Sequence, residues 1–321
     1  MKEIEVDGTL SAITASLNDV AAEFQSIWFR GQPNYEHKLV PGIFRQGPAF
    51  GVSFNEQLMF EEFKRRYPDQ SSSHKTTYEW LTLMQHYGLP TRLLDWSSNL
   101  LVSLYFCCMN DDEKDGALFI YDPTIMERNY KFTEFLEMQV LDKTRNEFYD
   151  RIIYRLDYLH GGNCQLNDIS LQELKDDKFK RHLMAGKHSV FNSLKMINPM
   201  NSDKYENGEF IHTYETELKR NFSNIVPFKA PHLNPRIRQQ HGYFTFHGGM
   251  FIEGKEFIPV GEMEDSMYTG DTLIKIKISK EDKKKLLKEL LYSGISESTL
   301  FPEMEYQAKE IKSLYTSKLM L

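Results

Sequence analysis

"QHYGLPTRLLDW", residues 85–96, concentrates polar, charged and aromatic side chains at one junction of the chain. The overlapping segment "YEWLTLMQHYGLP", residues 78–90, has its apolar residues at helical spacing, and Gly88 and Pro90 end the predicted helix. "TRLLDW" then predicts a tight connector or short strand, and "SSNLLVSLYFCCMN" predicts a buried helix capped by Ser97 or Ser98. Because backbone groups at helix ends are open to ligands, we expect a cleft here. The side chains that single it out are Gln85, His86, Tyr87, Arg92, Asp95 and Trp96.

Two distant stretches share this character. "WFRGQ", residues 28–32, predicts the end of a strand with Arg30 at its tip, facing either a cleft or a salt-bridge partner across the sheet. "RIRQQHGYF", residues 236–244, places Arg236 and Gln240 directly before another strand. Arg92 and Asp95 either pair with each other as a structural clamp or face a ligand. We expect the three stretches to meet.

The periodicity of the remaining chain predicts an α+β fold. A helix is expected within 9–24, and further strands at 116–123 and at 272–279, where Ile and Lys alternate. A leucine-rich helix follows at 280–295. We expect one central mixed or antiparallel sheet, split around a cleft and flanked by helices, within a single domain spanning 1–321. The segment at about 125–225 reads as a helical insertion in that domain.

Composition limits the function classes. The 321 residues carry a net charge of −7 at pH 7, which does not indicate a nucleic-acid partner, although a local basic patch remains possible. The chain has no apolar run long enough for a membrane span and no metal-ligand spacing. Its three cysteines include the adjacent Cys107 and Cys108 in an apolar run, which is typical of reduced, buried thiols. The sequence therefore predicts a cytoplasmic protein without a membrane partner or a metal.

The three stretches stand in the order and spacing of the FRG-domain family, named for the Phe-Arg-Gly of its first motif. The chain resembles this family over roughly residues 25–312, including the strand and helices of 274–311. The FRG pattern is similar in turn to enzymes of the ADP-ribosyltransferase type, which implies an ADP-ribosyltransferase-like fold and NAD as substrate. In such enzymes an arginine on the first strand binds the phosphates of NAD, and a late polar residue, usually Glu, activates the acceptor.

The resemblance implies roles for individual residues. Arg30 matches the phosphate-binding arginine, and the helix from Leu100 to Cys108 would pack beneath the nicotinamide pocket. Gln240 stands where the transferase pattern favours an acid; we therefore take Gln240, His86 and Glu253 as the catalytic candidates. The NAD-binding candidates are Arg30, Gly31, Gln32, Gln85, Tyr87, Thr91, Arg92 and Asp95, with Asp95 expected to orient Arg92.

On this basis the chain is expected to be an NAD-utilising, ADP-ribosyltransferase-like effector in phage defence or toxin systems, with an unknown macromolecular or small-molecule acceptor. Two alternatives stay open. One is a module that binds a nucleotide or another ligand without chemistry. The other is an NAD glycohydrolase, which differs from the transferase in using water as the acceptor.

Overall fold

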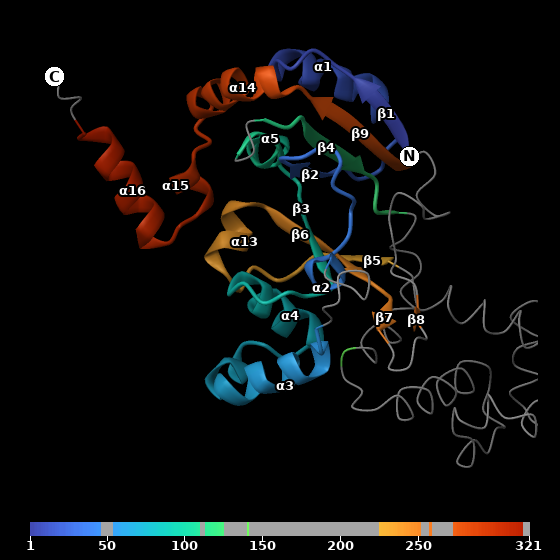
Figure 1. Ribbon diagram of the computed structural model, residues 1–321, viewed down its shortest axis with the longest axis vertical. Coiled ribbons are helices and arrows are strands. Elements are labelled where there is room, and N and C mark those ends of the chain that lie inside the picture. Colours follow the sequence, from blue (N-terminus) through green and yellow to red (C-terminus); the bar gives the residue numbers. More distant parts are fainter. Residues whose placement is uncertain are drawn as a thin grey trace, which may run out of the picture.

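The computed structural model describes residues 1–45, 54–109, 113–124, 140, 225–251, 257–258 and 272–316 (Figure 1). The helical insertion expected at about 125–225 lies almost entirely outside these residues. Glu253, one of the catalytic candidates, and Cys164 also lie outside them.

The core is a seven-stranded mixed sheet, which confirms the predicted α+β class. Its innermost strands include β2, formed by the "WFRGQ" stretch, and β3, formed by the end of the 85–96 stretch. The outer pair β1–β9 is parallel, and every other neighbouring pair is antiparallel. In spatial order the strands are β1 (Lys2–Glu5), β9 (Leu273–Ile278), β4 (Gly116–Tyr121), β2 (Trp28–Gln32), β3 (Leu93–Ser97), β6 (Gly242–His247) and β5 (Ile225–Phe228). A separate two-stranded sheet joins β7 (Met250–Phe251) to β8 (Phe257–Ile258).

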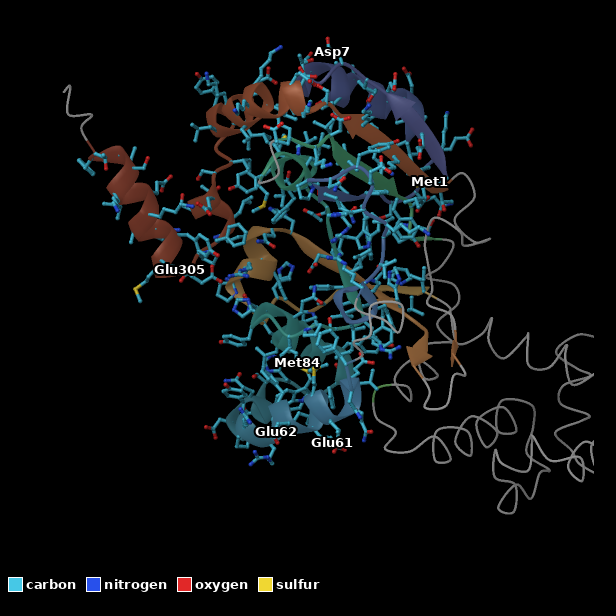
Figure 2. The ribbon with its side chains drawn as sticks, in the orientation of Figure 1. Met1, Asp7, Glu61, Glu62, Met84 and Glu305 are labelled. Carbon is cyan, nitrogen blue, oxygen red and sulfur yellow. The ribbon has the colours of Figure 1, made fainter. Side chains whose placement is uncertain are left out.

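Five of the described helices pack in two groups (Figure 1). Buried side chains of α1, α5 and α14 form one apolar cluster with β2, β4 and β9, and those of α3 and α4 form another with β3, β5 and β6. In the second cluster the fully buried Met84 of α4 faces α3, whose Glu61 is exposed (Figure 2). The bounds are α1 (Leu10–Val20), α2 (Gly42–Arg45), α3 (Glu56–Arg66), the 3₁₀ helix η2 (Pro68–Ser72), α4 (Thr77–His86), α5 (Leu100–Cys108), α13 (Pro235–Gln239), α14 (Lys280–Tyr292), α15 (Glu297–Leu300) and α16 (Met304–Leu314).

Helix α5 is buried as expected, but its cap differs from the predicted one. Asn99, rather than Ser97 or Ser98, caps the helix, since its side-chain oxygen accepts from the backbone N–H of Leu101 at 2.9 Å. Ser97 instead ends β3 and donates its hydroxyl to the backbone oxygen of Gln240 at 2.7 Å. That bond ties the residue directly after the 85–96 stretch to the 236–244 stretch. Cys107 and Cys108 are buried free thiols, in agreement with the prediction, and burial raises the pKa of Cys108 to about 12.

Gly31 allows α5 to lie directly on β2. A Cβ atom at this position would come within 1.8 Å of the backbone oxygen of Ser103 and 2.7 Å of the backbone nitrogen of Cys107. Backbone atoms in a packed helix cannot yield by that much. The glycine of the "WFRGQ" stretch is therefore required for helix–sheet packing.

The sheet separates between β2 and β3. These strands share one pair of facing residues, Phe29 and Ser97, whereas β3 pairs with β6 along its whole length. No other residues of β2 and β3 are in register with each other in the described part of the chain. The split places the first and second polar stretches on opposite sides of one opening.

Candidate functional site

A pocket of about 510 Å³ occupies the opening where β2 and β3 separate. Its walls come from β2, the end of α4, β3, α5, α13 and the start of β6, so all three polar stretches contribute. A volume of this size lies in the range typical of small-molecule sites. The predicted site residues that line it are Arg30, Gly31, Gln32, Gln85, His86, Asp95 and Gln240.

A chain of polar contacts links the "WFRGQ" stretch to the 85–96 stretch. Arg30 Nη1 donates to the backbone oxygen of Asp95 at 2.7 Å and lies 3.7 Å from its carboxylate Oδ2. Gln85 Nε2 donates to Asp95 Oδ1 at 2.7 Å, and Thr91 Oγ1 donates to Gln85 Oε1. Thr91 itself does not line the pocket, but it holds Gln85, which does. The guanidinium of Arg30 is thereby positioned at the pocket wall.

The interpretation of Arg92 as a ligand-binding residue oriented by Asp95 was wrong about its partner. Arg92 is buried and pairs with Glu56 of α3: its Nε donates to both carboxylate oxygens at 2.9 Å, and Nη2 also contacts Oε2. Its Nη1 donates to the backbone oxygens of His247 and Gly249 at 3.1 and 3.2 Å. A buried guanidinium needs this kind of complete pairing. Arg92 therefore ties α3 to the end of β6, and it does not line the pocket.

Tyr87 also lies outside the pocket lining. It follows the last residue of α4, its exposed fraction is 70%, and its ring packs edge-to-face on His86 with 4.8 Å between centroids. The pocket side of this junction is formed by His86 and not by Tyr87.

His86 belongs to a cluster that sequence reasoning missed in part. Arg236 donates from Nε to Glu303 Oε1 at 2.9 Å, and His86 Nε2 lies 4.0 Å from the same oxygen. Burial lowers the pKa of His86, the charge of Arg236 lowers it further, and Glu303 opposes both. His86 is thus favoured as a neutral imidazole near pH 7. Arg236 belongs to the 236–244 stretch, but no local sequence pattern indicates Glu303, which directly precedes α16.

Gln240 lines the same pocket as Arg30. Its Nε2 donates to the backbone oxygen of Leu300 in α15 at 3.3 Å, which leaves Oε1 as its remaining side-chain acceptor. Phe301, the residue after α15, also lines the pocket, and the guanidinium of Arg236 stacks 5.0 Å above its ring. The segment after α15 therefore closes one side of the site.

The charges that line the pocket favour an anion. They are three arginines, Arg30, Arg45 and Arg236, against one lining carboxylate, Asp95, while Glu303 outside the lining pairs with Arg236. His37 and His86 line it as well. Planar guanidinium groups with converging donors are suited to phosphate oxygens. Within the described ranges, no group of three or more His, Cys, Asp or Glu side chains is placed to hold a metal ion.

Comparison with protein families gives the domain. Residues 25–116 match the family model described as the FRG domain. The chain carries an FRG domain. The match runs from just before β2 to the first residue of β4, so it includes Arg30, Gln85 and Asp95 together with the Glu56–Arg92 pair. The extension of one such domain over 1–321 stays a prediction.

No curated protein and no solved structure matched the chain. The helices that the structure describes include none with the length and apolar character needed to cross a membrane.

Proposed function

We propose that the FRG domain binds NAD in the pocket between β2 and β3 and acts as an ADP-ribosyltransferase. The observation that carries the proposal is the position of Arg30: its guanidinium lies in the wall of a pocket lined by three arginines and one carboxylate. A dianionic pyrophosphate bound there would offset the excess positive charge. This is the location that the resemblance to transferases implied for the phosphates of NAD.

The proposed reaction uses few protein groups. The bond between ribose C1′ and the nicotinamide nitrogen breaks, its electron pair leaves with nicotinamide, and a nucleophilic atom of the acceptor bonds to C1′. Positive character develops on the ribose as the bond breaks, so positioning and local electrostatics supply most of the acceleration. Neutral His86 would accept the proton released by the acceptor, and Gln240 Oε1 would orient a ribose hydroxyl. The carboxylate of Asp95 would stabilise the developing positive charge.

The proposed biological role also comes from the resemblance to the FRG family. As an effector, the protein would transfer ADP-ribose to a target in conflict with phages or competing cells, which is the role that the family resemblance implies. The acceptor determines whether the chemistry ends in modification or in hydrolysis.

The test measures NAD binding by calorimetry and release of nicotinamide by chromatography. Arg30→Gln should abolish both, and Arg30→Lys should weaken binding because a lysine cannot donate in a bidentate manner. The matched control is Arg65→Gln, which removes an exposed arginine of α3, 70% exposed and remote from the pocket lining. It should leave both readouts at the wild-type level.

The outcomes separate the alternatives. Transfer of radiolabelled ADP-ribose to protein, RNA or DNA in a lysate supports the transferase. Release of nicotinamide without transfer indicates a glycohydrolase, and binding without release indicates a binding module. The absence of NAD binding to the wild-type protein refutes the proposal.

A further inference from the structure

Gln32 is a buried pocket residue whose amide oxygen lacks a hydrogen-bond partner among the described residues. It is the last residue of β2, its exposed fraction is 4%, and it lines the pocket. Its Oε1 is inaccessible to solvent and has no hydrogen-bond partner within the described part of the chain. Leaving a buried amide oxygen unpaired is costly, and most such groups in folded proteins are paired. The exception therefore points to a ligand group that would pair with the amide once its side chain turns toward the pocket.

The position of Gln32 on its strand sets it beside Arg30. Alternate residues of a strand point to the same face, so the side chains of Arg30 and Gln32 leave β2 together, about 7 Å apart along the strand. The opposite face carries Gly31 and the backbone of α5, which leaves no room for a side chain. Arg30 and Gln32 thus form one recognition edge within the pocket, a cation followed by an amide.

The amide of Gln32 matches a specific chemistry. A primary amide presents an acceptor next to a donor, and it forms two hydrogen bonds with a group that carries an N–H beside an acceptor. Carboxamides and the amino edge of adenine have this pattern, and Gln pairs with adenine in this way. Rotation of the amide about its last bond exchanges the donor and acceptor positions, so both orientations of the ligand group can be paired.

We propose that Gln32 is a specificity residue that pairs with an amide-like edge of the bound dinucleotide, while Arg30 holds its pyrophosphate. This inference rests on the proposed NAD site. NAD carries two such edges, the carboxamide of nicotinamide and the amino group of adenine. The pairing with either edge selects against a dinucleotide in which that edge has been deaminated.

The test compares three ligands by calorimetry. They are NAD, nicotinic acid adenine dinucleotide, which has a carboxylate in place of the carboxamide, and nicotinamide hypoxanthine dinucleotide, which has lost the adenine amino group. The wild-type protein should bind one of the two analogues about 10- to 100-fold more weakly than NAD, because a buried polar group is left unpaired. The analogue that is rejected identifies the edge that Gln32 contacts.

Gln32→Met removes the amide and keeps a side chain of similar length. This variant should bind NAD about as weakly as the wild type binds the rejected analogue, and it should no longer discriminate. Without ligand its melting temperature should equal or exceed that of the wild type by a few degrees, since an unpaired buried group has been removed. Gln70→Met, which replaces an exposed glutamine of η2, is the matched control and should change neither readout.

Each result decides a different claim. Equal wild-type affinities for all three ligands, with NAD bound equally well by Gln32→Met, overturn the role of Gln32 and leave the NAD site standing. A marked fall in the ligand-free melting temperature of Gln32→Met also overturns it, because the amide would then have a structural partner. If the wild type binds none of the dinucleotides, the proposed function fails, and this inference fails with it.

Discussion

Replacing Glu56 by Gln should destabilise the fold strongly while leaving the pocket intact. Glu56 is the carboxylate partner of Arg92, and neither side chain exceeds 9% exposure. The guanidinium also lies 5.4 Å from the ring of Phe44 and 5.5 Å from that of Phe246. With a neutral amide in place of the carboxylate, Arg92 would retain its full charge in this apolar surrounding.

The size of the effect follows from the burial of the pair. Removing one partner of a buried ion pair typically costs about 3–5 kcal/mol of unfolding free energy. Since each kcal/mol shifts the melting temperature of a domain of this size class by about 2–4 °C, Glu56→Gln should lower it by roughly 6–20 °C. The double variant Glu56→Met/Arg92→Met should recover most of that loss, because an apolar pair leaves no charge unpaired.

Thermal unfolding followed by circular dichroism measures the effect, with NAD affinity determined in parallel below the transition. Glu62→Gln on the same helix is the control: its carboxylate forms solvent-exposed ion pairs with Arg65 and Arg66, so the midpoint should barely change. A small shift for Glu56→Gln, accompanied by lost NAD affinity, would refute the reasoning and return Arg92 to the ligand-binding set.

Three further predictions concern residues of the site. Gly31→Ala forces a Cβ to within 1.8 Å of a backbone oxygen of α5, so urea unfolding should show that the free energy of unfolding falls by about 3 kcal/mol or more. The control Gly42→Ala, whose Cβ would have 3.8 Å of clearance, should lower it far less. Equal losses for the two variants would count against the packing role of Gly31. Asp95→Asn removes the carboxylate 3.7 Å from Arg30, so NAD affinity measured by calorimetry should rise about two- to five-fold. Nicotinamide release should slow, because the positive charge that develops on the ribose loses its counter-charge; release at the wild-type rate would contradict the role of Asp95. The pKa of His86 in the folded chain lies below its ordinary value of 6.5, so the unfolded chain binds the proton more readily. The free energy of unfolding should therefore fall as the pH drops below about 6.5. His86→Gln should flatten that fall, and an unchanged pH profile for this variant would contradict the lowered pKa.

The sequence predicted the convergence of the three polar stretches because each stands at the end of a regular element. "WFRGQ" reads as a strand from its aromatic residues, and "QHYGLP" carries the stop signals of a helix. Polar residues at such ends gather at openings in a sheet. Arg30, Gln85 and Gln240 accordingly line one pocket.

The sequence did not reveal which of the charged residues in the 85–96 stretch faces the pocket. Arg92 and Asp95 are three positions apart and look like a pair, but β3 begins at Leu93 and includes Asp95. The extended backbone points side chains three positions apart to opposite faces, and Arg92 is buried in the core. The partner of Arg92 lies 36 positions earlier, in a helix with no local feature that distinguishes Glu56 from its acidic neighbours. Long-range pairing of this kind depends on tertiary packing, which periodicity does not encode.

The wall formed after α15 was missed for the same reason. Glu303 and Phe301 reach the site from the far end of the chain, and their contacts with Arg236 have no signature in the spacing of either stretch. In Figure 1, α16 extends outward from this wall, and Glu305 marks its start in Figure 2.

A crystal structure of the protein soaked with NAD tests the central claim most directly. We expect the pyrophosphate between β2 and β3, with at least one phosphate oxygen within hydrogen-bonding distance of the Arg30 guanidinium. A dinucleotide bound elsewhere on the protein, or an empty pocket at a saturating concentration of NAD, would contradict it.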